Sequence, residues 1–292
     1  MHKATLDTTY FHKRYCLWGT DRKVCIVKLE IISRYPENRT RATPLLFVHG
    51  AFMGAWVWAE TVLPYMAQHG YEAHAVSLRG HGQSEGRERL SGFGLDDYVE
   101  DIEQAVGKIG SSPVLIGHSM GGAVAQRYMR QHELPGVVLM ASVPPEGTLG
   151  SMLENLLRNP MTIAATGLLQ SFLPRTMLAR PVRRAFFSQD LPDERLRKYL
   201  ARMQPESHRA ILQLTRPIPS SWQPREETPI LVIGGERDTL IPEKLIRDTA
   251  DHYGTSAWIC PEVAHLMFLE TRWRDVTDHL VQWLDDLVAA HG

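Results

Sequence analysis

The stretch PVLIGHSMGG, residues 113–122, decides the fold of this chain. Its apolar first half is typical of a buried strand, and the residues after it are compatible with a helix. Between them, Ser119 is flanked by Gly117 and Gly121. A side chain at either glycine would collide with a neighbouring element in so tight a turn, so the G-x-S-x-G spacing has a steric cause. We therefore expect a turn that presents the Ser119 hydroxyl at the carboxyl end of a sheet, beside the unpaired amide of Met120 at a helix start.

A serine hydroxyl becomes an effective nucleophile when an imidazole takes its proton and a carboxylate orients that imidazole. Two later apolar runs, 229–235 and 256–260, predict strands, and each is followed by a loop with a suitable group. Asp238 follows the first run and His265 the second, which gives the order serine, aspartate, histidine. Glu236 remains an alternative acid, although it lies closer to the strand end.

Three other histidines near glycine-rich turns compete for the role of base: His49, His81 and His118. His118 is adjacent to Ser119, so its side chain should point away from the hydroxyl and pack or hydrogen-bond beneath the turn. The place of His265 after the last predicted strand favours it as the base.

With these motifs the chain resembles the α/β-hydrolase superfamily, in its esterase- and lipase-like serine hydrolase branch, over most of residues 44–290. Further segments agree with the family pattern: LLFVHGA at 45–51, SLRGHGQS at 77–84, GGERD at 234–238 with Pro242, and HLM at 265–267 with Glu270. In addition, HGAFMGAWVW at 49–58 is similar to the start of the subgroup containing plant methylesterases and hydroxynitrile lyases.

The resemblance implies an oxyanion hole formed by the amides of Ala51 and Met120. In this mechanism His265 takes the proton of Ser119 as the hydroxyl attacks a carbonyl carbon, and Asp238 stabilises the imidazolium. His265 then protonates the leaving group, and water releases the acyl group in a second cycle. No metal and no organic cofactor is implied, because the site carries its own nucleophile.

Apolar strands alternate with helical stretches along the chain, which predicts an α/β fold with a mostly parallel sheet covered by helices on both faces. Strands are expected at 24–32, 44–48, 72–78, 113–118, 136–142, 229–234 and 256–260, and helices near 55–69, 95–108, 120–132, 240–252 and 272–290. The interval from 142 to 229 has no strand pattern. We expect a hydrolase core at 1–144 and 225–292, with a helical cap at 145–224 inserted into it.

The first half of the expected cap is rich in large apolar side chains. Among them, Leu169 and Phe172 are expected to line a substrate pocket together with Phe52, Met53 and Met267. Packing of the cap helices on one another is the competing explanation. Residues 150–224 also carry eleven Lys or Arg against five Asp or Glu. This excess would attract anionic substrates or a membrane surface, or it forms a solvated helix surface.

Length and composition fit a large core: the chain has 292 residues, of which 43% are hydrophobic. A net charge of −1 argues against bulk nucleic-acid binding. The three cysteines fit no metal or disulfide spacing, which favours a reducing compartment. The start lacks a signal-peptide pattern, and no apolar run reaches the ~18 residues of a membrane span. We expect a cytoplasmic protein without an integral membrane segment.

The sequence thus predicts a serine hydrolase that acts on a small-molecule carboxylic ester with an apolar acyl or alcohol part. Thioesterase, lactonase and carbon–carbon bond hydrolase activities use the same residues and remain open, as does, less favoured, a hydroxynitrile lyase. A small-molecule receptor that keeps the triad but turns over slowly is an alternative of another class. Serine at 119 argues against the dehalogenases and epoxide hydrolases of this fold, which have aspartate at that place.

Overall fold

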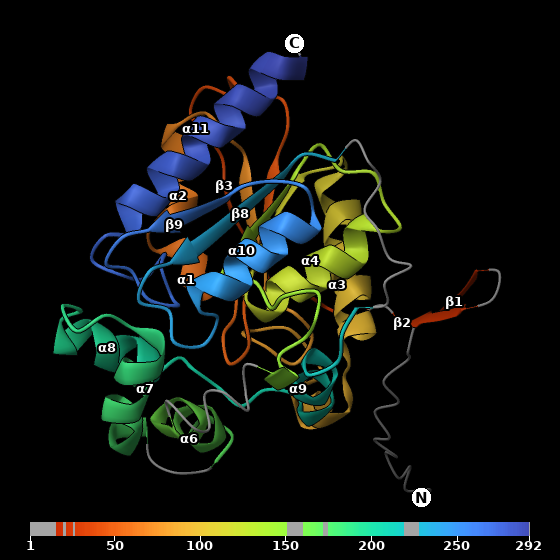
Figure 1. Cartoon of the computed structure of the whole chain (residues 1–292). Helices are drawn as coiled ribbons and strands as arrows, with labels where there is room; N and C mark the ends of the chain where they lie inside the picture. Colours follow the sequence, from red (N-terminus) through yellow and green to blue (C-terminus); the bar gives the residue numbers. More distant parts are fainter. Residues whose placement is uncertain are drawn as a thin grey trace, which may run out of the picture.

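A seven-stranded sheet forms the centre of the protein (Figure 1). The computed structural model describes residues 16–19, 22–25, 27–150, 160–171, 175–218 and 228–291. In spatial order the strands are β3 (Ile31–Arg34), β5 (Ala73–Val76), β4 (Leu45–Val48), β6 (Val114–His118), β7 (Val137–Met140), β8 (Ile230–Gly235) and β9 (Ala257–Cys260). β3 runs antiparallel to β5, and the other neighbouring pairs are parallel. The predicted fold class is confirmed.

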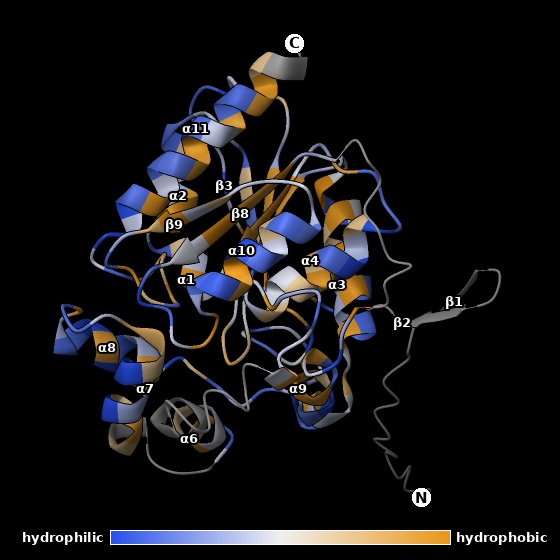
Figure 2. Cartoon of the chain, viewed as in Figure 1, coloured by the Kyte–Doolittle hydropathy of each residue, from blue (hydrophilic) through white to orange (hydrophobic). Residues whose placement is uncertain are grey.

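Helices cover both faces of this sheet, because alternate strand residues point to opposite sides. In β4, Leu45 and Phe47 join one buried cluster, whereas Leu46 and Val48 join another. The first face carries α1 (Trp56–Ala59), α2 (Val62–Gln68) and α11 (Trp273–His291), and the second carries α3 (Leu95–Ile109), α4 (Met120–Met129) and α10 (Glu243–His252). Figure 2 shows the apolar strands between helices whose outer faces are hydrophilic.

The prediction of one leading strand at 24–32 is wrong, because two separate elements occupy that region. β1 (Cys16–Gly19) and β2 (Arg22–Cys25) form their own antiparallel pair, with Cys16 opposite Cys25, and β3 begins only at Ile31. Between β2 and β3, backbone carbonyls accept hydrogen bonds from the loop after β5. The amide of Ser77 donates to the carbonyl of Glu30, and the amide of Glu85 donates to the carbonyl of Lys28. Residues 28–30 therefore pair with a loop and not with the sheet.

The segment between β7 and β8, residues 141–229, is called the insertion below. Its described elements are helical: α6 (Pro160–Leu169), η2 (Arg175–Leu178), α7 (Ala179–Phe186), α8 (Asp193–Leu200) and α9 (His208–Leu214). Together with η1 (Arg87–Gly92), they are the described elements outside the central sheet, its two helical layers and the β1–β2 pair. In Figure 1, α6, α7, α8 and α9 lie in the lower part of the molecule. No helix within the described ranges is both long enough and apolar enough for a membrane span.

Candidate active site

The turn between β6 and α4 holds Ser119 in an unusual backbone conformation with a positive φ, at φ 52° and ψ −115°. A side chain on Gly117 would place its Cβ 2.5 Å from the carbonyl oxygen of Gly121, and one on Gly121 would lie 2.5 Å from that of Val48. Both glycines are therefore required by close backbone approach, as the sequence predicts. Non-glycine residues adopt such a conformation at a cost of about 1–3 kcal/mol, which the surroundings must offset.

Backbone hydrogen bonds on both sides of Ser119 fix this strained turn. Its amide donates to the carbonyl of Met140 on β7 at 3.0 Å. Its own carbonyl accepts the amides of Gly122 at 3.0 Å and Val143 at 3.2 Å. The nucleophile candidate is thus held by the neighbouring strand and by the first residues of the insertion.

His265 and Asp238 meet in the loops that follow β9 and β8. The Nδ1 atom of His265 lies 2.7 Å from Oδ2 of Asp238, and both side chains are buried. The other oxygen of Asp238 accepts the amides of Leu240 at 2.8 Å and Ile241 at 2.9 Å. An ionised carboxylate only accepts, so Nδ1 of His265 carries the hydrogen and Nε2 is left to accept a proton.

Glu236, the alternative acid, has a different partner. Its carboxylate accepts the amide of Glu262 at 2.9 Å in an exposed part of the loop. The structure therefore brings Asp238 to the imidazole, and it places Glu236 at the surface.

The loop after β4 passes close to Ser119. A Cβ on Gly50 would lie 3.0 Å from Cβ of Ser119 and 2.7 Å from Nδ1 of His118. Ala51 follows it and lines the same cavity as Ser119. Met120 is the first residue of α4, where an amide has no intrahelical acceptor. Of the two expected oxyanion donors, Met120 therefore follows Ser119 in the chain, and Ala51 lines the same cavity as Ser119.

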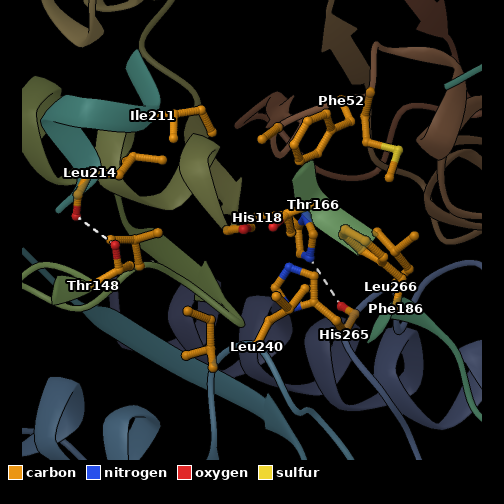
Figure 3. A pocket seen from close by; sticks show the side chains of 15 residues that line it. Phe52, His118, Thr148, Thr166, Phe186, Ile211, Leu214, Leu240, His265 and Leu266 are labelled. Carbon is orange, nitrogen blue, oxygen red and sulfur yellow. Dashed lines mark hydrogen bonds between the residues drawn. The ribbon is translucent and has the colours of Figure 1, made fainter. Parts of the chain in front are cut away.

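A cavity of about 140 Å³ opens over Ser119 and His265 (Figure 3). Phe52 and Met53, two of the expected pocket residues, belong to its wall. The remaining lining residues are Ala51, His118, Val143, Thr148, Thr166, Phe186, Ile211, Leu214, Leu240, Ile241 and Leu266. The cavity thus combines residues of the loop after β4, the acid and histidine loops, and the insertion.

The other expected pocket residues are placed differently. The prediction that Leu169 and Met267 line the pocket is corrected by the structure. Both side chains are fully buried in the core cluster and are not among the lining residues. In α6, Leu169 shares the buried face of Ala165, and among the described side chains of this helix Thr166 reaches the cavity. In the histidine loop, the residue on the wall is Leu266. Phe172 lies outside the described residues.

Comparison with known proteins places these features in a family. A model described as "Alpha/beta hydrolase family" matches residues 45–279. The chain belongs to this family. A non-heme haloperoxidase of Rhodococcus erythropolis is 33% identical over 106 residues, which are 35% of this chain and 38% of that protein. Protein phosphatase methylesterase 1 of Bos taurus is 32% identical over 133 residues, 43% of this chain and 35% of its own. The chain spans less than half the length of the curated relatives it matches.

Solved structures of hydrolases resemble this chain over nearly its whole length. An esterase of Exiguobacterium antarcticum superimposes with a TM-score of 0.72 at 18% identity, covering 89% of this chain and 96% of the esterase. A thermophilic esterase of Thermogutta terrifontis gives a TM-score of 0.69 at 20% identity, covering 89% and 94%. At such identities the likeness establishes the α/β-hydrolase fold.

In this α/β hydrolase, His118 supports the histidine loop. Its Nε2 donates to the carbonyl of His265 at 3.0 Å, a bond drawn as a dashed line in Figure 3. Burial, with the charge of His265 as a second cause, holds the pKa of His118 well below 6.5. His118 thus stays neutral and anchors the backbone of the candidate base, and its ring also lines the cavity.

His49 of this α/β hydrolase is likewise a buried neutral histidine. Its Nε2 lies 3.1 Å from the amide of Leu78, which can only donate, so its Nδ1 carries the hydrogen and donates to the carbonyl of Gly50 at 2.8 Å. Burial, followed by the charge of His81, lowers the pKa of His49 to about 3. The ring thereby stabilises the loop that contains Ala51.

We expect acidification to destabilise the fold through these histidines. Unfolded His49 takes up a proton near pH 6.5, whereas the folded group does so only near 3, so below pH 6.5 the unfolded chain binds more protons. For His49 alone the free energy of unfolding falls by about 1.4 kcal/mol between about pH 7.5 and 5.5. His118 contributes in the same direction. Urea unfolding at the two pH values measures this difference.

His69→Gln, which alters an exposed histidine, is the matched control and should keep the pH dependence of the wild type. His49→Gln should reduce it. A urea midpoint that does not change between the two pH values would contradict the prediction.

Sequence reasoning missed the cavity residues supplied by the insertion, above all Phe186, Ile211 and Leu214. A weak signal exists for two of them, because Ile211 and Leu214 are three residues apart and share one face of α9. Phe186 ends α7 beside His265, with the two ring centroids 5.9 Å apart. Its position depends on the packing of the insertion, which no local pattern encodes.

Proposed function

We propose that this α/β hydrolase is a serine hydrolase that cleaves carboxylic esters. The observation that carries the proposal is the hydrogen bond of 2.7 Å between buried His265 and Asp238, with His265 and Ser119 lining one cavity. The strained turn at Ser119 and the esterase folds that resemble this chain support the same activity.

The proposed chemistry follows from these positions. Nε2 of His265 takes the proton of Ser119 as its hydroxyl oxygen attacks the ester carbonyl carbon. The negative charge on the carbonyl oxygen is stabilised by the amides of Met120 and Ala51, and the imidazolium by Asp238. His265 protonates the departing alcohol, and a water molecule then hydrolyses the acyl-enzyme in the same manner.

The cavity supports an uncharged ester with a small apolar acyl group. Its described lining residues include no carboxylate, ammonium or guanidinium group. The hydroxyl of Thr148 is already engaged with the carbonyl of Leu214 at 3.2 Å. A volume of about 140 Å³ is close to the roughly 150 Å³ of a protein cavity that accepts benzene. We propose that the expected cap at 145–224, which lies within the insertion, selects this group and that the rest of the chain supplies the chemistry.

We expect p-nitrophenyl butyrate and hexanoate to be hydrolysed with a higher kcat/KM than laurate and palmitate, because the longer chains exceed the cavity. Ile211→Ala should raise the ratio of kcat/KM for octanoate over butyrate by about tenfold, since a methylene in a pocket is worth about 1–3 kcal/mol. Steady-state release of p-nitrophenol measures both effects.

Leu212→Ala is the matched control, because Leu212 is on the same helix and 57% exposed. It should leave the ratio unchanged. If palmitate were the best substrate, the assignment of a small acyl group would be wrong. If no ester were hydrolysed, the proposed activity itself would be wrong.

A further inference from the structure

The segment from Met203 to Ser207, which joins α8 to α9, is called the strap. It passes directly beside the loop after β4 that contains Ala51 and Phe52, which is called the oxyanion loop. The amide of Gln204 donates to the carbonyl of Phe52 at 3.0 Å, and the amide of Phe52 points to Oε2 of Glu206 at 3.4 Å. The strap therefore holds both ends of one residue in the loop after β4.

Phe52 is held in this way in a strained conformation, with φ 70°. A left-handed backbone is unfavourable for a bulky residue and persists where contacts from outside impose it. Phe52 directly follows Ala51, so the peptide that the strap grips is the one next to the candidate oxyanion amide. A change in this peptide would redirect the Ala51 amide.

Glu206 makes the strap rigid, because its carboxylate is fully buried and collects several donors. His81 Nε2 lies 2.9 Å from Oε2, and the hydroxyl of Tyr98 and the amide of Ser207 lie 2.8 Å and 2.6 Å from Oε1. Burial alone would raise the pKa of Glu206, but the charge and hydrogen bond of His81, with the Ser207 and Tyr98 bonds, outweigh it and lower the pKa. The carboxylate is therefore ionised at neutral pH.

His81 is the partner of Glu206. Its Nδ1 faces the carbonyl of Arg79 at 3.2 Å, and its Nε2 faces the carboxylate of Glu206. Both neighbours of the ring are hydrogen-bond acceptors, which fixes the ring between them. The side chains of His81 and Glu206 are 0% exposed, and such a buried pair is geometrically demanding because each polar group depends on the other for a partner.

The strap also forms hydrogen bonds with an earlier part of the insertion and with the loop after β5. The side chain of Gln170, just after α6, accepts the amide of Glu206 at 2.9 Å and donates to its carbonyl at 3.1 Å. The side chain of Gln204 donates to the carbonyl of Gly80 at 2.9 Å and accepts the amide of Gly82 at 3.2 Å. The position of the insertion is thus transmitted to the oxyanion loop by direct hydrogen bonds.

We propose that Glu206, paired with His81, is a positioning residue that fixes the oxyanion loop and so aims the Ala51 amide at the developing oxyanion. This proposal rests on the proposed ester hydrolysis. Glu206 acts through Phe52 and does not touch the reacting atoms. Its removal therefore weakens binding of the transition state and leaves binding of the ground-state ester nearly unchanged.

Glu206→Gln tests the proposal, because it keeps the shape of the side chain and removes the charge. We expect kcat for p-nitrophenyl butyrate to fall by about 10- to 100-fold with KM within about twofold of the wild type. The inhibition constant of a trifluoromethyl ketone, whose serine adduct carries an oxyanion, should rise by the same factor as kcat/KM falls. A purely structural role would not link these two changes.

Glu72→Gln is the matched control. Glu72 is another glutamate paired with a histidine, His74 at 3.0 Å, but it lies at the start of β5, at the end of the sheet opposite the candidate site. It should leave kcat and the inhibition constant as in the wild type. Circular dichroism and urea unfolding verify that each variant is folded at the assay temperature.

Gln170→Ala provides a second arm, because it releases the strap without leaving a buried charge unpaired. It should lower kcat several-fold and raise the inhibition constant of the trifluoromethyl ketone by the same factor. The proposal is overturned if folded Glu206→Gln keeps kcat and ketone affinity within twofold of the wild type. If Glu206→Gln does not fold, wild-type values in Gln170→Ala overturn it. Failure of the proposed ester hydrolysis is distinguishable from failure of this proposal, because the wild-type protein itself would then hydrolyse no ester.

Discussion

Ser119→Ala is expected to abolish ester hydrolysis, with kcat reduced on the order of 10⁶-fold. The substitution removes the hydroxyl that forms the acyl-enzyme and leaves the hydrogen bonds of the turn in place, since these involve only the backbone of residue 119. A fluorophosphonate probe should label the wild type at this residue and fail to label the variant. Intact-mass spectrometry measures the labelling, and p-nitrophenyl butyrate measures the turnover.

The folded state of Ser119→Ala is verified by its urea midpoint, which should remain close to that of the wild type. Ser142→Ala is a matched control, because Ser142 is another buried serine near the turn whose hydroxyl is already bonded to Gln126 and Val143. It should retain labelling. Labelling that survives in Ser119→Ala would assign the nucleophile to another residue.

Asp238→Asn is expected to lower kcat on the order of 10⁴-fold. The amide oxygen of asparagine can still accept the amides of Leu240 and Ile241, which directs its NH₂ group toward Nδ1 of His265. Nδ1 must then accept, so the hydrogen moves to Nε2 and the imidazole loses its ability to take the serine proton. Rates of p-nitrophenyl butyrate hydrolysis measure the loss.

Glu236→Gln is the corresponding control. Its carboxylate contacts an exposed amide and not the imidazole, so the variant should hydrolyse esters at the wild-type rate. A collapse of activity in Glu236→Gln, together with near-normal rates in Asp238→Asn, would transfer the acid role to Glu236.

The elbow, the order of its partners and the sheet were predictable because each depends on local rules. Gly117 and Gly121 are dictated by backbone contacts of 2.5 Å, and such contacts leave a fixed spacing in the sequence. The strands are short apolar runs flanked by helical periodicity, and the loops that follow β8 and β9 carry Asp238 and His265. The prediction of a leading strand at 24–32 failed because the hydrogen-bond partners of residues 28–30 come from residues 77–85, which lie far away along the chain.

The cavity and the strap were not predictable, because their residues carry no local signal. Leu169 and Thr166 lie on one short helix, and only its packing decides which of them reaches the cavity. Glu206 is a charged residue in a polar stretch, a pattern typical of the surface, yet it is buried. Its meaning depends on His81 and Tyr98, which are 125 and 108 residues away in the sequence.

The strap sets a limit on how this α/β hydrolase can be recombined with its relatives. A chimera that exchanges the whole insertion would import a new acyl pocket, but it would also discard Gln204 and Glu206. The backbone of Phe52, the carbonyl of Gly80 and the ring of His81 would then lose their partners. The exchangeable module therefore ends before Met203, and the donor segment joined there must bring a glutamine at the place of Gln170, whose side chain holds the backbone of Glu206.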